Sequence, residues 1–503
     1  MRSTVASSVL ILAVIAVVGM APANGLGRTR GSVDLVLHNG VVWTNDGRGT
    51  VAEAIALSDD RIVAVGSDAE VLRRAKRGAR VVDLDGGTVL PGLRDQHTHL
   101  LQVAGGGAGA EAYQPVWEGY NPVTSEAIRG VIAAYHLATK AQGQTPEDGC
   151  TRSPVTPELK DAVLTAQNEA AKQGLTSVVE AGLSDMGVLD ALFELDDADL
   201  LTLRWLVRVG WGCLEEAAEQ GLRTGAGSEF VKILGVKLYS DGWLGPRTSA
   251  LREMYNDRPY DGVLFLDQRR ANADVARARE LGFNVTTHAI GDEGIQTMLN
   301  AYEANGVTKK DRYQLEHVQV LAPDIVARMA RVGVIGSIQT SFATTDQRFA
   351  ESALGPERMA ESYAWRTMRR RGVRLAGGSD YNVEALAPLW GLQRVITRTE
   401  FDGTPPGGWL PDERLSRKAA LRLITSDTAY ASFEERERGR LTPGRYADLT
   451  VLREDLLTLP VDCIAAATVV MTVVNGRIAF DGAQAYPPGD ATCPSGAAPA
   501  TGG

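Results

Sequence analysis

The sequence has few of the residues that mark several common classes of protein. It contains only four cysteines and no C-x-x-C spacing, which disfavours a thiolate metal site. No G-x-G-x-x-G turn follows the first strand of the central region, so a dinucleotide-binding sheet is also disfavoured. Lysine and arginine total 52 against 62 acidic residues, a net charge of −10, and no basic stripe occurs. We therefore expect no nucleic-acid partner.

Long apolar runs are also scarce, and the marked one lies near the N-terminus. Residues 9–20 are apolar, follow Arg2 and precede the small residues Ala21-Pro22-Ala23. This run is shorter than the roughly 18 residues that a membrane span requires, and it is typical of an export signal. We expect a signal peptide over residues 1–23 and an exported protein, secreted or periplasmic, with no stable membrane span after cleavage. An uncleaved anchor is the alternative.

The four cysteines and the composition of the chain ends are compatible with export. In an exported protein one or two disulfides are allowed, and Cys463 with Cys493 is the pair closest in sequence. Residues 24–31 are rich in glycine and residues 486–503 are rich in glycine, proline and alanine, and we expect a linker and a mobile tail there.

Two β-rich segments lie near opposite ends of the chain. Residues 32–88 alternate short apolar runs with turns such as Asn39-Gly40, and residues 439–485 repeat the pattern with Asn475-Gly476. Their similarity predicts one small β-sandwich domain that is built from both ends of the chain.

Residues 89–438 follow another pattern, in which an amphipathic helix, a glycine and a short apolar strand with a polar end recur. The glycines lie where a helix end favours a left-handed residue; they are Gly174, Gly282, Gly333 and Gly372. Eight such strands, mostly separated by helices, predict an α/β fold of the (β/α)8 TIM-barrel type. A doubly wound open sheet is the alternative.

Histidine is rare as well, with six residues, and four of these end apolar runs. With one lysine and one aspartate they form the candidate metal ligands: His97, His99, Lys237, His288, His317 and Asp380. Imidazoles and carboxylates with room for a water are what a divalent-metal hydrolytic site needs. We expect one or two divalent ions, for which zinc is well suited and manganese, iron or nickel are alternatives.

Lys237 and Asp380 could take part in such a site in different chemical forms. Lys237 cannot bind a cation as an ammonium, but burial favours the free amine, which can form a bridging carbamate with carbon dioxide. An ion pair of Lys237 with Asp241 or Glu180 is the alternative. Asp380 could bind a metal, accept a proton from water and return it to the leaving nitrogen, which makes it the candidate catalytic residue.

Other polar and aromatic residues are candidates for supporting roles. Asp95 shares the strand face of His97 and could orient a ligand, whereas Asp292 precedes a helix and could instead cap it. Residues in loops that follow strands could contact a small-molecule substrate or simply pack within their loops; they are Trp243, Arg247, Phe342 and Tyr381.

Several motifs resemble the amidohydrolase superfamily, and in particular its branch with N-substituted formamide deformylases and related exported enzymes. The similar segments are LPGLRDQHTHL, VKLYSDGWLGPRTSAL, THAIGDEG, LEHVQ, GGSDYNVEALAPL, LTPGRYADLTVL and TVVNGRIAF. The resemblance implies a binuclear site with His97 and His99 on one ion and His288 and His317 on the other. It further implies a carbamylated, bridging Lys237 and an Asp380 that shuttles protons.

The chain also departs from this family pattern. The segment between His99 and Thr176 is shorter than in relatives, so we expect a different substrate pocket. Arg94 stands where relatives carry an apolar residue.

The leading hypothesis is a metal-dependent hydrolase that cleaves an amide or another C–N bond of a small molecule. In it, a metal-bound hydroxide attacks the carbonyl carbon and Asp380 protonates the departing amine. A lactonase or esterase with the same metal centre is one alternative, since the same nucleophile attacks either carbonyl. A non-catalytic binding or regulatory protein with this fold is the other. The sequence leaves the oligomeric state open.

Overall fold

The computed structural model describes residues 33–101, 137, 141, 145 and 148–482. The expected signal peptide, linker and tail lie outside these residues, so export stays a prediction. None of the helices in the described ranges combines the length and apolar character that crossing a bilayer requires.

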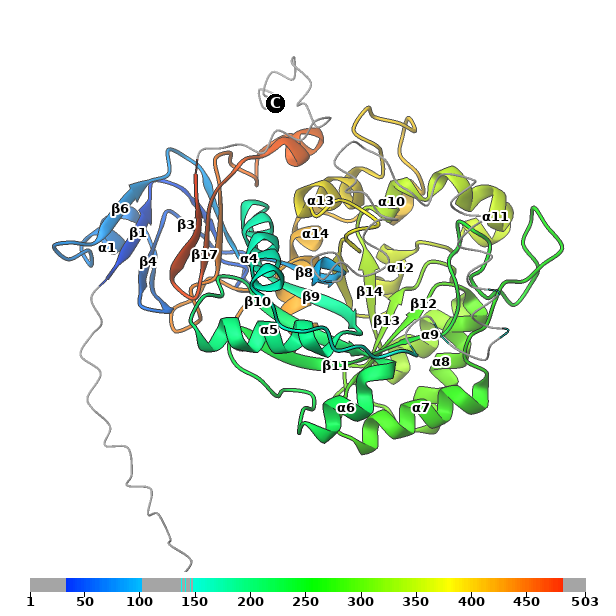
Figure 1. Cartoon of the computed structure of the whole chain (residues 1–503). Coiled ribbons are helices and arrows are strands. Elements are labelled where there is room, and N and C mark those ends of the chain that lie inside the picture. The colour runs from blue at the N-terminus through cyan, green and yellow to red at the C-terminus, as the bar shows by residue number, and fades with distance from the viewer. Residues whose placement is uncertain (1–32, 102–136, 138–140, 142–144, 146–147, 483–503) are drawn as a thin grey trace, which may run out of the picture.

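Eight parallel strands form the centre of the larger unit (Figure 1). They are β8 (Leu93–Thr98), β9 (Leu175–Leu183), β10 (Arg204–Gly210), β11 (Val231–Tyr239), β12 (Val285–Ala289), β13 (Gln314–His317), β14 (Ile335–Gln339) and β15 (Leu375–Gly378). They are hydrogen-bonded in sequence order, and a parallel bridge between Thr98 and Tyr381 brings the last strand back to the first. The predicted (β/α)8 barrel is therefore confirmed.

Helices cover the outside of this barrel and connect most of its strands (Figure 1). They are α4 (Pro157–Lys172), α5 (Met186–Asp197), α6 (Leu214–Glu219), α7 (Gln268–Glu280), α8 (Asp292–Ala304), α9 (Pro323–Val332), α10 (Phe342–Thr345), α11 (Gln347–Met359), α12 (Trp365–Arg370), α13 (Pro388–Thr397), α14 (Arg417–Leu423) and α15 (Ser426–Ala431), with the 3-10 turns η2 (Trp211–Cys213), η3 (Pro411–Glu413) and η4 (Val461–Ala466). The four glycines expected after helices all have positive φ, and Gly333 is the left-handed C-cap of α9.

Two further sheets form the smaller unit, on the left in Figure 1. One contains β5 (Arg61–Gly66), β4 (Ala54–Ser58), β1 (Leu35–His38) and β6 (Arg80–Asp83), and α1 (Asp68–Leu72) follows β5. The other contains β18 (Arg477–Asp481), β17 (Val469–Val474), β16 (Leu449–Leu452), β7 (Thr88–Pro91), β2 (Val41–Trp43) and β3 (Val51–Ala52). β7 pairs with β16 and their side chains share one apolar core, so both chain ends build the sandwich as predicted. The division of the chain at residues 88/89 and 438/439 stays a prediction.

Arg94 has a structural role in a buried ionic network. Its Nη2 lies 2.5 Å from Glu434 Oε2, and Arg438 Nη1 lies 2.9 Å from the other oxygen of Glu434. Arg438 also contacts Asp448, which forms two hydrogen bonds with Arg204 of β10. The network connects the first barrel strand to the chain segment that enters the sandwich, which explains a charged residue at this position.

Disulfide bonds involve three described cysteines. Cys150 and Cys213 are joined, with 4.9 Å between their Cα atoms. Cys463 is disulfide-bonded as well. The expected partner of Cys463, Cys493, lies outside the described residues.

Candidate metal centre

The ends of β8 and β15 bring His97, His99 and Asp380 together. His97 Nε2, His99 Nε2 and Asp380 Oδ1 are each 3.3 Å from the other two atoms. A point equidistant from three such atoms lies about 1.9 Å from each, close to the roughly 2.0–2.2 Å bonds of zinc to histidine nitrogen and carboxylate oxygen. All three side chains are shielded, with His99 the most exposed at 14%. The donor atoms therefore fit a divalent cation.

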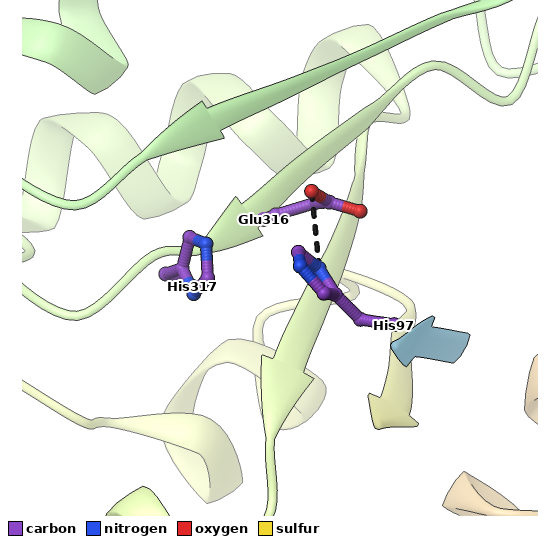
Figure 2. Close-up of side chains that lie close together, drawn as sticks. All are labelled: His97, Glu316 and His317. Carbon is purple, nitrogen blue, oxygen red and sulfur yellow. Dashed lines mark ion pairs between the residues drawn. The ribbon is translucent and has the colours of Figure 1, made fainter. Parts of the chain in front are cut away.

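Backbone conformation at two strand ends aims further side chains into the barrel. Asp380 has φ 62° and His317 has φ 74°, in the left-handed region that non-glycine residues rarely adopt. In a regular strand, Glu316 and His317 would point to opposite faces. The turn at His317 instead lets both side chains reach the interior, where they flank His97 (Figure 2). Strain of this kind recurs at functional sites.

Glu316 lies between the candidate ligands and two buried cations, and sequence reasoning missed it. Its Oε2 is 3.1 Å from His97 Nδ1, the pair joined by the dashed line in Figure 2, and it also pairs with Lys237 Nζ. Its Oε1 is 2.6 Å from Arg208 Nη1. The ion pair that the structure shows for Lys237 is thus with Glu316, whereas the sequence suggested Asp241 or Glu180. A glutamate directly before a strand-end histidine in a fully buried strand was the available signal.

His288 and His317 complete the group of four histidines. Their ring centroids are 4.4 Å apart, and those of His97 and His317 are 5.1 Å apart. His317 Nδ1 lies 2.8 Å from Gln339 Oε1, an acceptor, so a neutral ring carries its proton there. His317 Nε2 is buried without a hydrogen-bond partner among the described residues, as a ligand atom would be before a metal binds. His288 stacks on Tyr239 at 5.1 Å.

Electrostatics favour the neutral, metal-binding form at three of the four candidate histidines. At His97 burial opposes the charged ring, but Glu316 and Asp380 raise its pKa. Burial lowers the pKa of His99, lowers that of His288 well below its usual range, and lowers that of His317 to about 3. Burial opposes the charge of Asp380, but the surrounding histidines, His97 first, hold its pKa well below the usual range. Neutral imidazoles beside a carboxylate form a suitable donor set for zinc.

Three acidic side chains around the site accept hydrogen bonds from backbone N–H groups, and Asp241 Oδ1 also lies 3.8 Å from His288 Nε2. Asp95 Oδ1 accepts hydrogen bonds from the backbone N–H groups of His97 and Ser379, at 3.0 and 2.9 Å. Asp241 accepts from Ala250, Ile290 and Gly291, and burial raises its pKa to about 7. Asp292 is the first residue of α8 after the N-cap Gly291, and its carboxylate accepts from the backbone N–H of Arg252.

A cavity with 390 Å³ of unfilled space, part of it open to solvent, lies against His288, His317 and Asp380. Two of the four candidate substrate-binding residues, Trp243 and Phe342, line it. Arg247 and Tyr381 are not among the described lining residues. The guanidinium of Arg247 instead binds Asp257 and Ser352, and the Tyr381 carbonyl accepts from the His99 backbone N–H.

A match to a family model identifies the protein at the level of its family. Residues 123–480 match the amidohydrolase family. The chain belongs to this family. Among curated relatives, this amidohydrolase is 27% identical to Protein LONG AFTER FAR-RED 3 of Arabidopsis thaliana, over 90% of the chain and 92% of that protein. It is 24% identical to N-substituted formamide deformylase of Arthrobacter pascens, over 89% of the chain and 98% of that protein.

A more similar but shorter match is to the putative amidohydrolase YtcJ of Bacillus subtilis, at 32% identity over 50% of the chain and 48% of that protein. Among solved structures, an uncharacterized metal-dependent hydrolase from Pyrococcus furiosus has a TM-score of 0.67 at 23% identity, covering 84% of this amidohydrolase and 99% of that chain. Atrazine chlorohydrolase from Arthrobacter aurescens, complexed with zinc, has a TM-score of 0.58 at 16% identity, covering 90% and 96%. These structural likenesses concern the fold.

Proposed function

We propose that this amidohydrolase is a metal-dependent enzyme that hydrolyses an amide or another C–N bond in a small molecule. The observation that carries the proposal is the triangle of His97 Nε2, His99 Nε2 and Asp380 Oδ1, each 3.3 Å apart, at the C-terminal rim of a TIM barrel and next to a cavity. Active sites of such barrels lie at this rim. The deformylase relative, named for its action on N-substituted formamides, supports the reaction class.

The side chains support a division of roles. His97, His99 and Asp380 would hold one divalent cation, and His288 and His317 would contribute to a second. A bound cation of this kind activates water and polarises a carbonyl oxygen. The Asp380 carboxylate lies 3.3 Å from His97 Nε2 and 3.9 Å from His317 Nδ1, so it can accept a proton from water and deliver it to the leaving nitrogen. Phe342 stacks on the His317 ring with 6.3 Å between centroids and limits the movement of that ring.

Zinc is the proposed metal, because imidazole nitrogens and a carboxylate oxygen match its preferences. Lys237 decides between one metal and two. As an ammonium it is neutralised by Glu316, whereas a carbamate would stand beside Glu316 with the same charge and would need cations to hold it. We also propose that the protein is exported, and the Cys150–Cys213 disulfide supports an oxidising compartment.

Elemental analysis combined with a substrate panel tests the proposal. The full chain, purified and loaded with zinc, should contain one or two equivalents of metal and hydrolyse at least one of a set of N-formyl and N-acyl compounds. A parallel set of esters and lactones distinguishes the esterase hypothesis. Failure to bind zinc, or activity confined to the esters, would overturn the proposal.

A further inference from the structure

The cavity beside the candidate metal ligands has a mostly apolar wall. The apolar residues that line it come from three loop regions and from α10 and α11; they are Trp243, Leu244, Ile290, Phe342, Phe349 and Val383. Apart from His288, His317 and Asp380, the polar side chains on its described wall are Gln319 and Asp346. Away from the candidate metal ligands, a ligand with an apolar body would therefore meet polar side chains of the described wall at one place, formed by Gln319 and Asp346.

Two hydrogen bonds to its Oδ2 atom hold the carboxyl group of Asp346 in place. Tyr363 Oη donates to Asp346 Oδ2 at 2.8 Å, and Gln319 Nε2 donates to the same oxygen. Gln319 Nε2 also donates to Tyr363 Oη at 2.8 Å, which closes a ring of three buried side chains. None of the hydrogen bonds found among the described residues involves Asp346 Oδ1. This oxygen is the one that remains for a ligand in the cavity.

The charges around the cavity determine which ligand group Asp346 would bind. Asp346 is 3% exposed, Asp380 lines the same cavity, and no lysine or arginine belongs to the described lining. Burial first, and then repulsion by Glu384 and Asp380, raises the pKa of Asp346 well above its usual range. An ionised Asp346 therefore lacks a countercharge, which a positively charged N–H group would supply.

We propose that Asp346 determines substrate specificity by binding a protonated amine at the far end of an apolar substrate body. This inference rests on the proposed function, since it assumes that the scissile amide lies at His97, His99 and Asp380. The substrate class is then an N-acyl or N-formyl compound with an aromatic or aliphatic body and a second, cationic nitrogen. The body packs against residues such as Trp243 and Phe349, and Asp346 Oδ1 accepts from the ammonium group.

A matched pair of formamides tests the inference on the zinc-loaded full chain. The probes are N-formylbenzylamine and its 4-aminomethyl derivative, which differ only in the distal amine. We expect about tenfold or higher kcat/KM for the amine, because hydrogen bonds between charged groups exceed neutral ones. The difference should lie mainly in KM, since Asp346 contacts the distal group and not the reacting amide.

Two variants separate recognition by Asp346 from a merely structural role. In Asp346→Asn the amide oxygen should take the place of Oδ2, because both neighbours donate there, and the amide N–H₂ should then face the cavity. The preference for the amine should disappear in this variant, and also in Asp346→Leu. Asp274→Asn is the matched control, because Asp274 is a buried acid on α7, outside the described lining of the cavity. It should keep the preference.

A calorimetric titration keeps this test separate from the test of the reaction. The two formamides are titrated into the metal-free wild type and the metal-free Asp346→Asn variant, which lack the cation that hydrolysis requires. Tighter binding of the 4-aminomethyl formamide by the wild type alone supports the inference even if neither formamide is hydrolysed by the zinc-loaded chain, which would count against the proposed function only. Equal binding of both formamides, or an unchanged preference in Asp346→Asn, would overturn the inference.

Discussion

Asp95 and Ser379, 284 residues apart, join the first and last strands of the barrel through a 2.9 Å hydrogen bond from the Ser379 N–H to the Asp95 carboxylate. The same oxygen accepts from the His97 N–H at 3.0 Å. One side chain therefore positions the backbone before Asp380 and the backbone of a candidate metal ligand. The first and last strands also pack closely at this point, since a Cβ added to Gly378 would lie 2.6 Å from the His97 backbone nitrogen.

Replacement of Asp95 should therefore disturb both stability and metal binding. Asp95→Ala leaves two buried N–H groups without an acceptor, and we expect a loss of about 1–3 kcal/mol in unfolding free energy. Zinc affinity should fall as well, because the His97 and Asp380 donors lose their common support. Urea unfolding and zinc titration measure the two effects. Asp199→Ala, at an exposed ion pair with Arg477, is the control and should change neither.

Asp380→Asn tests the proton-transfer role. Asparagine keeps the size of the side chain but cannot accept and return a proton, so kcat should fall at least about 100-fold. The circular dichroism spectrum should match that of the wild type. Asp402→Asn, in an exposed loop, should retain full activity. Undiminished turnover in Asp380→Asn would contradict the assignment.

Lys237 should be unmodified while the site is free of metal. A carbamate would carry its negative charge next to buried Glu316, so the ammonium form is the favoured partner. In ¹³C-bicarbonate, NMR of metal-free protein should show no carbamate signal, and any signal should arise only after zinc is added. Lys237→Met should abolish that signal. A carbamate in the metal-free wild type would refute this account of the pair.

Arg247 should influence substrate binding through the loop that carries Trp243. Its guanidinium joins Asp257, Ser352 and the Gly245 carbonyl, and Leu244 and Gly245 line the cavity. Arg247→Ala frees this loop, and we expect kcat/KM to fall roughly tenfold to 100-fold, mainly through KM. Arg258→Ala removes an exposed arginine that contacts the same aspartate and should have little effect. Equal effects of the two variants in steady-state kinetics would argue against the loop explanation.

Glu434 should make stability depend on pH. Burial opposes its charge, but Arg94 and then Arg438 hold its pKa well below the usual range. A lowered folded-state pKa means that the stabilisation is complete above the unfolded-state pKa of about 4.3 and is lost as the pH falls through the folded-state pKa. Glu434→Gln should therefore be less stable than the wild type by about 3 kcal/mol near pH 7, with a gap that narrows below pH 4.

Urea unfolding at several pH values measures this gap. Glu435→Gln is the matched control, because the neighbouring Glu435 forms a partly exposed pair with Arg312 and should contribute far less. A gap that stays constant down to pH 3 would show that Glu434 is not the titrating group.

The fold class followed from local patterns in the chain, and the same patterns predicted that the candidate ligands meet at one rim of the barrel. The period of helix, glycine and strand predicts a barrel, because each amphipathic element has to bury one face against the next, and strand-end residues of a barrel meet at one rim. His97, His99, His288, His317 and Asp380 do gather there, although their role as ligands stays a prediction. The family resemblance agrees with the match of residues 123–480.

Which side chains face one another depends on the closed barrel and could not be predicted from local patterns. Glu316 pairs with Lys237, and Asp346 reaches the cavity, because closure of the ring and left-handed turns at strand ends set directions that sequence spacing does not encode. Arg247 was expected among the substrate contacts, yet its loop turns it toward Asp257. Local patterns depend on neighbours in the chain, whereas these contacts depend on residues far apart in sequence that meet only when the barrel closes.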